Sequence, residues 1–140
     1  MDRWDIRGAV DPDAFGSFID HDADATDLEF AGTDAFELFL AQHVIEELVD
    51  YPAALDEVAR VVEPGGRALL EIPFDARRRR SVRQAPDQYS NQWSFGTDLI
   101  GELEARFDRV EPVSVADGEY RGVILVCRAS RMGAQPDVGS

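Results

Sequence analysis

The stretch AFELFLAQHVIEELVDYPAALDEVARVVEPGGRALLEIP, residues 35–73, decides the fold. Residues 35–41 are an apolar run of strand length, 51–62 predict a helix, and 67–72 are a second apolar run. A strand, a crossover helix and a second strand make the parallel βαβ unit. Ligands of such units bind at the carboxyl ends of the strands. We therefore expect the functional rim at 41–43 and from Pro73 onward.

The helix over 51–62 has clear boundary signals. Asp50 can cap its first turn, Pro52 suits that turn, and apolar residues recur at helical spacing. Pro64-Gly65-Gly66 is predicted to end the helix. This segment precedes a strand, which is the reverse of the strand-to-helix order of a phosphate-binding loop, so its role is structural. Apolar and polar residues alternate little along strand 35–41, so we expect helices on both faces of the sheet.

The carboxyl-terminal half predicts a helix and a hairpin after an irregular segment, 74–95. The helix begins at Ser94 or Thr97 and has apolar residues on one face. Strands near 109–115 and 121–128 follow, and Asp117-Gly118 between them favours a hairpin. We expect one domain over 1–128 and a disordered tail over 129–140.

The composition indicates a cytoplasmic protein. No run approaches the roughly 20 apolar residues of a membrane span, and the first five residues are no signal peptide. The single cysteine, Cys127, excludes an intramolecular disulfide and is expected to pack in the core. We therefore expect no membrane partner.

The charge is strongly acidic. Fourteen arginines and no lysine stand against 28 Asp and Glu residues, for a net charge of −14. Such a surface repels nucleic-acid phosphates, so we expect no nucleic-acid partner. The pattern is typical of proteins from salt-loving microbes, and it also fits an acidic protein from a GC-rich genome.

Four motifs in order resemble class I S-adenosylmethionine-dependent methyltransferases of the "type 11" group. The motifs are DATDLEF (24–30), FELF (36–39), HVIEE (43–47) and EVARVVEPGG (57–66). The resemblance covers roughly residues 8–128. It implies an α/β fold with a Rossmann-like methyltransferase sheet, mostly parallel with a C-terminal antiparallel hairpin. It also implies S-adenosyl-L-methionine as cofactor and a small or modified molecule as methyl acceptor.

The same resemblance implies a cofactor site. Asp24 matches the acidic position that meets the adenine amino group, and the backbone of Ala25 the one that contacts the ring. Asp11 corresponds to the residue that binds the ribose hydroxyls. Ala41, Gln42 and His43 line the methionine part. Asp24 also reads as one more surface carboxylate, and Asp11-Pro12-Asp13 as a turn.

His43 has two interpretations. Its imidazole can act as a general base, because the unperturbed group titrates near neutrality. It can equally cap a helix or pack against one. The family's second histidine is Glu47 in this sequence, so there is no histidine pair for a metal, and no other residues have metal-ligand spacing.

The resemblance also implies an acceptor site beyond the second strand. There, Phe74, Arg77, Tyr89 and Trp93 are the candidate substrate residues. The arginine run 77–80 with Arg83 can meet an anionic substrate, or it can pair with the surplus carboxylates of a solvated loop.

The resemblance also implies what the amino end lacks. The family's glycine-rich cofactor loop has no counterpart before Asp11, where Gly8 is the only glycine. The fold is thus expected to be abbreviated, with an open edge at strand 35–41. Residues 1–10, a homodimer, a partner subunit, or a longer gene can complete the sheet. The alternative function is a non-catalytic methyltransferase-like partner or scaffold subunit.

Overall fold

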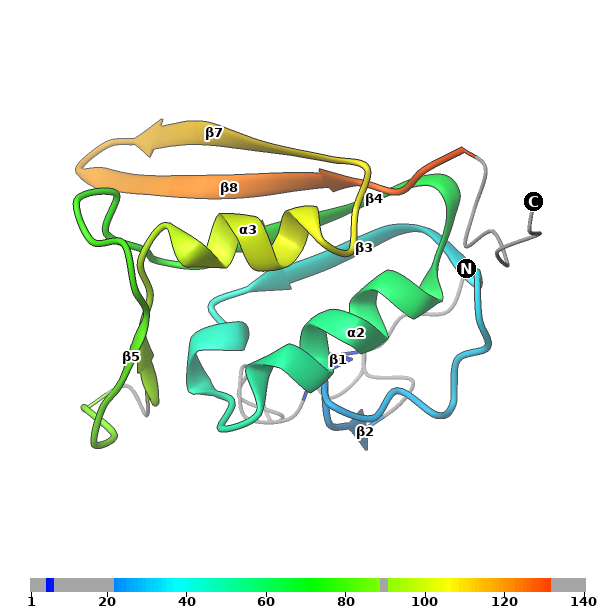
Figure 1. The fold of residues 1–140 in the computed structure, drawn as a ribbon, viewed down its shortest axis with the longest axis horizontal. Coiled ribbons are helices and arrows are strands. Elements are labelled where there is room, and N and C mark those ends of the chain that lie inside the picture. The colour runs from blue at the N-terminus through cyan, green and yellow to red at the C-terminus, as the bar shows by residue number, and fades with distance from the viewer. Residues whose placement is uncertain (1–4, 7–21, 89–90, 132–140) are drawn as a thin grey trace.

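The computed structural model describes residues 5–6, 22–88 and 91–131 (Figure 1). The larger elements are β3 (Phe36–Gln42), the 3-10 turn η2 (Ile45–Glu47), α2 (Tyr51–Val61), β4 (Val62–Glu71), α3 (Asp98–Glu104), β7 (Arg109–Asp117) and β8 (Tyr120–Arg128). Two short pairs lie outside the main sheet: β1 (Asp5–Ile6) with β2 (Asp22–Ala23), and β5 (Val82–Arg83) with β6 (Trp93–Ser94). The predicted domain boundary and tail stay predictions.

Four strands form the main sheet, in the order β3-β4-β8-β7. β3 and β4 run parallel, with Phe39 opposite Ala68 and Gln42 opposite Glu71. β8 is antiparallel to both β4 and β7. The predicted α/β class is confirmed, with a parallel pair joined through α2 and a C-terminal antiparallel hairpin.

Helix α2 begins where the sequence predicts. Oδ1 of Asp50 accepts a hydrogen bond from the backbone N–H of Ala53 at 3.3 Å, so the expected cap is present. The helix ends at Val61, and β4 begins at Val62. The prediction that the Pro-Gly-Gly segment ends the helix is therefore wrong.

The Pro-Gly-Gly segment instead lets β4 bend closely against β3. The pairing register shifts between Phe36 and Leu38 of β3. Gly65 has φ +79°, in the left-handed region that favours glycine. A Cβ on Gly66 would lie 2.9 Å from the carbonyl oxygen of Glu37. The segment is structural, as expected, but its place is inside the strand.

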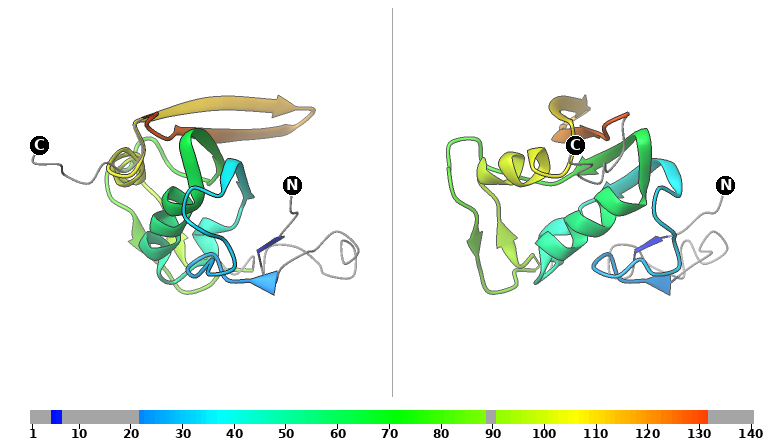
Figure 2. Two further views of the ribbon diagram at one scale, coloured as in Figure 1. Left: turned by 90° about the vertical axis from the view of Figure 1, so that its right-hand side faces the viewer. Right: turned by 45° about the vertical axis from the view of Figure 1, so that its right-hand side comes forward.

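Helices α2 and α3 lie on the same side of the sheet (Figures 1 and 2). The core fills the space between them and the sheet. It is made by Phe39, Ala41, Ala68, Leu70, Leu125 and Cys127 from the strands and by Leu55, Val58, Val61, Leu99 and Leu103 from the helices. Burial raises the pKa of the Cys127 thiol to about 12, so this cysteine stays protonated and packs in the core at neutral pH.

The opposite face of the sheet is partly uncovered. Leu38 is 37% exposed and Leu40 is 61% exposed, whereas Phe39 between them is 1% exposed. No described helix lies on this face (Figure 2). The expectation that helices cover both faces is thus wrong for the part of the chain that the structure describes.

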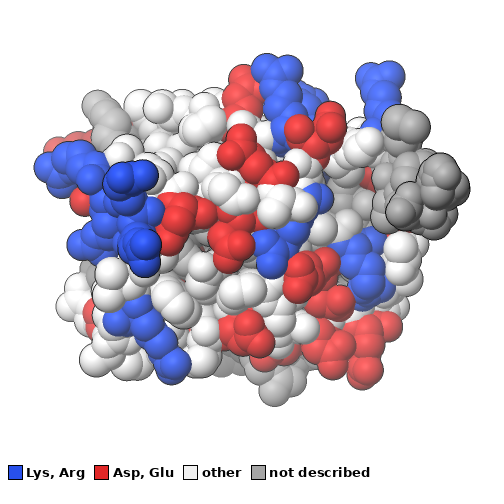
Figure 3. Space-filling model, viewed as in Figure 1, with Lys and Arg blue, Asp and Glu red and all other residues white. Residues whose placement is uncertain are grey.

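Charge is unevenly distributed over the molecule. Figure 3 shows a group of basic side chains at the left end, near the segment that carries β5 in Figure 1, and further basic side chains at the top, centre and right. Acidic side chains lie across the centre and toward the lower right. Among the described helices, none is both long and apolar enough to cross a bilayer.

Candidate functional site

The carboxyl ends of β3 and β4 lie side by side. Gln42 ends β3, Glu71 ends β4, and the parallel register pairs these two residues directly. After each strand the chain leaves the sheet, from β3 into the η2 turn and from β4 into the 74–95 segment. The rim expected from the sequence therefore exists as a continuous edge.

Four polar side chains form one cluster at this rim. The amide nitrogen Nε2 of Gln42 donates to Oε1 of Glu71 at 2.9 Å. The imidazole of His43 lies between two carboxylates, with Nδ1 2.9 Å from Oε2 of Glu46 and Nε2 3.3 Å from Oε2 of Glu71. His43, which directly follows β3, thus contacts a residue of η2 and a residue of β4.

Glu46 is the buried member of this cluster. Its side chain is 2% exposed, and its Oε1 is the one buried side-chain oxygen or nitrogen without a hydrogen-bond partner in the described part of the chain. Burial raises the pKa of this carboxyl, although the hydrogen bond from His43 partly opposes the shift. Its backbone carbonyl accepts from the N–H of Gln92 at 2.8 Å, which ties η2 to the segment before β6.

The backbone of His43 is unusual for a residue with a side chain. Its φ is +54°, in the left-handed region, which costs a non-glycine residue about 1 kcal/mol. Its N–H donates to the carbonyl of Glu71 at 2.9 Å. The strained backbone turns the chain out of β3 and directs the imidazole toward the two carboxylates.

The second predicted cluster, Asp24 with Ala25, lies in a separate loop. Oδ1 of Asp24 accepts from the N–H and the hydroxyl of Thr26, at 2.9 and 2.8 Å. Asp24 is exposed and Ala25 is fully buried. Within the described residues, no hydrogen bond joins this loop to Gln42 or His43.

Helix α2 holds this loop in place. Oε2 of Glu57 accepts from the backbone N–H of Leu28 at 2.8 Å, and Arg60 donates to the carbonyls of Leu28 and Ala31 at 3.0 Å each. Glu57 and Arg60 also bind each other at 2.8 Å. The hydrogen bond from Arg60, followed by that from Leu28, holds the pKa of Glu57 below its usual value.

A cavity of about 460 Å³ opens beside the carboxyl end of β4. Three of the four predicted substrate residues line it, namely Phe74, Arg77 and Trp93. The amides of Gln84 and Asn91 line it too. The structure thus brings three of these candidates together, and their role as substrate residues stays a prediction. Tyr89 lies outside the described residues, as does the ribose candidate Asp11.

Aromatic contacts fix one wall of this cavity. Trp93 packs edge-on against Tyr51 at a ring distance of 4.9 Å and stacks with Phe95 at 6.1 Å. Its indole N–H donates to the carbonyl of Val49 at 3.3 Å. Trp93 therefore presents a preformed apolar surface.

The arginine run remains largely without carboxylate partners. Arg77 binds Asp75 at 3.2 Å, but no described carboxylate contacts the guanidinium groups of Arg79, Arg80 or Arg83. Of Arg77, Arg79, Arg80 and Arg83, only Arg77 pairs with a carboxylate, as one interpretation of the run expected. Arg77 is 91% exposed and already neutralised by Asp75, so it does not by itself select an anionic ligand.

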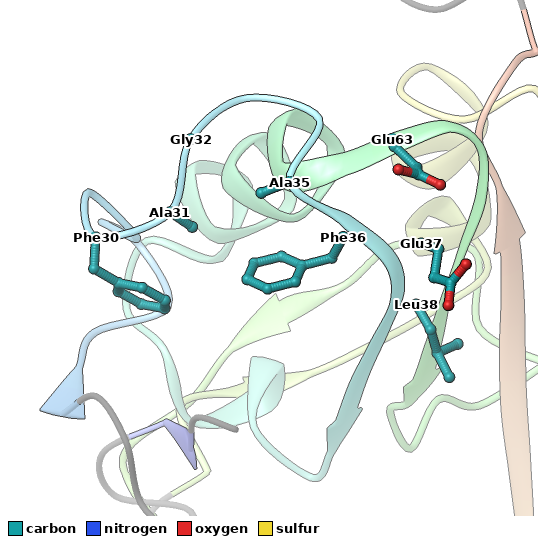
Figure 4. Close-up of a pocket in the computed structure, with 8 residues that line it drawn as sticks. All are labelled: Phe30, Ala31, Gly32, Ala35, Phe36, Glu37, Leu38 and Glu63. Carbon is teal, nitrogen blue, oxygen red and sulfur yellow. The ribbon is translucent and has the colours of Figure 1, made fainter. Parts of the chain in front are cut away.

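A second cavity, of about 490 Å³, lies at the amino-terminal end of β3. Figure 4 shows Phe30 and Phe36 extending into it, with Glu37 and Glu63 at its other side. Parallel strands bind ligands at their carboxyl ends, so the position of this cavity does not fit the expected cofactor. Among the described residues, no group of three or more His, Cys, Asp or Glu is arranged to hold a metal ion.

The sequence pointed to Gln42 and His43, but not to Glu46 or Glu71. The spacing of three residues between His43 and Glu46 across a turn was the available signal for Glu46. Glu71 is distant in sequence, and its contact with His43 depends on the exact pairing of β3 with β4. The buried side chain of Ala41 faces the core, so only its backbone can line the rim.

A comparison with known protein families finds a match. Residues 10–70 match the family model described as "Methyltransferase domain". No curated protein matches the sequence.

Solved structures show the same fold. The complex between the Haloferax volcanii Trm112 methyltransferase activator and a methyltransferase has a chain that is 14% identical, with a TM-score of 0.60; the match covers 79% of this chain and 61% of that one. A Burkholderia thailandensis 1,6-didemethyltoxoflavin-N1-methyltransferase, with bound S-adenosylhomocysteine, is 13% identical (TM-score 0.62; 89% and 60% covered). A Bacillus halodurans methyltransferase structure is 13% identical (TM-score 0.55; 91% of each chain covered).

The family model over residues 10–70, which is under half of the chain, and the Rossmann-like methyltransferase fold of these structures both support the resemblance to class I S-adenosylmethionine-dependent methyltransferases. The chain spans about 60% of the length of two of these three structural relatives.

Proposed function

We propose that this chain is a class I methyltransferase, which binds S-adenosylmethionine at the carboxyl rim of β3 and β4 and transfers its methyl group to a small acceptor. One observation carries the proposal. The polar cluster of Gln42, His43 and Glu71 and the cavity lined by Phe74 and Trp93 lie at the carboxyl ends of two paired parallel strands. Cofactor and acceptor therefore have neighbouring places on one edge.

The residues at the rim fit this cofactor chemically. Carboxylates accept hydrogen bonds from amino groups and favour the positive sulfonium. Glu71 at the rim and Asp24 in its loop supply such groups. Gln42 at the end of β3 and His43 just after it are exposed. When bound, S-adenosylmethionine supplies an activated methyl group, so alignment of the reactants is the main task of the protein.

The acceptor is expected to meet the cavity beside β4. The fixed indole of Trp93 and the ring of Phe74 suit a flat, apolar part of a small molecule, and the amides of Gln84 and Asn91 can orient its polar groups. This assignment makes no use of Arg77, whose charge Asp75 neutralises.

Calorimetric titration of the purified chain with S-adenosylmethionine tests the proposal. We expect one-to-one binding, at low and at high salt. Asp24→Ala should lower the affinity while the melting temperature stays within a few degrees, because Asp24 is exposed and its contacts are local. Absence of binding heat would favour the non-catalytic scaffold, and an unchanged affinity in the variant would remove Asp24 from the site.

A further inference from the structure

The His43 cluster contains a carboxylate that the proposed function has not used. Glu46 is nearly inaccessible to solvent, and its one side-chain partner among the described residues is Nδ1 of His43. Burial of a carboxylate away from water is unfavourable unless it binds a donor. A buried carboxylate beside a histidine at a ligand rim therefore needs an explanation beyond packing.

The distances from the two ring nitrogens to their carboxylates indicate which nitrogen carries the proton of a neutral His43. A neutral imidazole has one N–H, and each ring nitrogen of His43 faces a carboxylate oxygen. The Nδ1 contact is the shorter, at 2.9 Å against 3.3 Å. Glu46 is also the less solvated partner, because its side chain is 2% exposed and that of Glu71 is 11% exposed. Leaving Glu46 without a donor is the costlier arrangement, so Nδ1 carries the proton.

We propose that Glu46 is a positioning residue, which holds His43 in the Nδ1–H form so that the lone pair of Nε2 can take a proton from the methyl acceptor. The side chain of His43 is 46% exposed, so an acceptor at the rim can reach the ring. Glu46 and the unprotonated Nε2 lie on either side of the His43 ring in the same relation as the carboxylate and the basic nitrogen of a catalytic triad. This inference rests on the proposed methyl transfer.

The chemical step balances with these groups. A heteroatom of the acceptor forms a bond to the methyl carbon while the carbon–sulfur bond breaks and its electron pair stays on sulfur. The proton of that heteroatom moves to Nε2 of His43. The resulting imidazolium then donates to Glu46 from Nδ1 and to Glu71 from Nε2, so both carboxylates stabilise it. The acceptor class that follows is a nitrogen or oxygen nucleophile that carries a proton.

Nitrogen NMR of the imidazole tests the inference without any ligand. The chain has two histidines, His21 and His43, and His43→Asn assigns the signals by removing one set. At a pH where the ring is neutral, we expect the proton of His43 on Nδ1 in the wild type. Glu46→Met keeps the length of the side chain but removes the acceptor, so the Nδ1–H signal should be lost and the proton should move to Nε2.

Matched variants separate positioning from packing. Glu47→Met changes the neighbouring carboxylate on the same turn and should leave the Nδ1–H form intact, as should Glu71→Gln. A wild-type His43 protonated on Nε2 would overturn the inference even if Glu46→Met did not fold. So would a Glu46→Met protein that keeps Nδ1–H. Neither result depends on whether S-adenosylmethionine binds, which the calorimetric titration decides separately.

Discussion

At the scale of single residues, Glu57 connects the Asp24 loop to helix α2. Its carboxylate accepts from the backbone of Leu28 and from Arg60, which in turn binds two carbonyls of the same loop. One side chain thus satisfies a backbone donor of the loop and orients the arginine that satisfies its acceptors.

Acidification should weaken this connection. The pKa of Glu57 is held below 4.5 in the folded chain, so the ionised carboxylate stabilises the fold above pH 4.5, and that stability is lost as the pH falls through the folded pKa. We expect Glu57→Gln to lower the free energy of unfolding by about 1–2 kcal/mol at pH 7. The difference from the wild type should shrink toward pH 3, as measured by denaturant titration at each pH.

An exposed carboxylate of the same loop provides the control. Glu29→Gln makes the same chemical change without the contacts to Leu28 and Arg60, and we expect it to stay within about 0.5 kcal/mol of the wild type at every pH. A Glu57→Gln penalty that is the same at pH 3 and pH 7 would contradict the electrostatic explanation.

Sequence reasoning at this scale succeeded where the signal was local. Asp50 caps α2, and Gln42 and His43 occupy the rim because both follow a recognisable strand. The left-handed backbone of His43 could not be foreseen, since such conformations usually belong to glycine. The role of Glu71 depends on the register between two strands, which no short motif contains.

At the scale of elements, β3 is an exposed edge of the sheet. It is an edge strand of the four-stranded sheet, and Leu38 and Leu40 on its uncovered face are exposed. Edge strands commonly carry lysine or proline that discourages pairing with other chains, and β3 has neither. The expectation that a second subunit completes the sheet stays a prediction.

Light scattering at increasing concentration measures that association. If β3 pairs with a second copy, the wild type should exceed the monomer mass of 15.5 kDa, and Leu40→Lys should return it to that mass. Val113→Lys is the matched control, because Val113 is also an exposed apolar residue but lies on β7, at the other edge. A wild type that remains monomeric at the highest concentration would exclude self-association through β3.

The elements themselves were largely predictable, and the covering of the sheet was not. Apolar runs and a capped amphipathic segment indicated β3, α2 and β4, and the Asp-Gly pair indicated the hairpin, in which Gly118 has φ +59°. Because apolar and polar residues alternate little in 35–41, the sequence predicted helices on both faces of the sheet. The structure instead leaves Leu38 and Leu40 exposed, because both described helices pack on the side of Phe39.

At the scale of the whole molecule, the net charge of −14 makes stability sensitive to salt. Like charges on a compact chain repel one another, and concentrated salt shortens the range of that repulsion to about 3 Å. We expect the melting temperature to rise by about 5 °C or more between 0.1 M and 2 M KCl, measured by circular dichroism. A melting temperature that falls or stays constant would contradict the claim that charge repulsion limits the stability of the folded state. It would also remove the support for a salt-adapted protein.

The fold alone does not establish the activity, because function resides in the site that a fold carries. The central claim is therefore about place: the cofactor binds at the carboxyl ends of β3 and β4. Backbone NMR of the full chain during titration with S-adenosylhomocysteine measures this directly. We predict shifts at Gln42, His43 and Phe74, with little change at the opposite cavity around Phe36. Shifts confined to that opposite cavity, or no shifts at saturating ligand, would contradict the account.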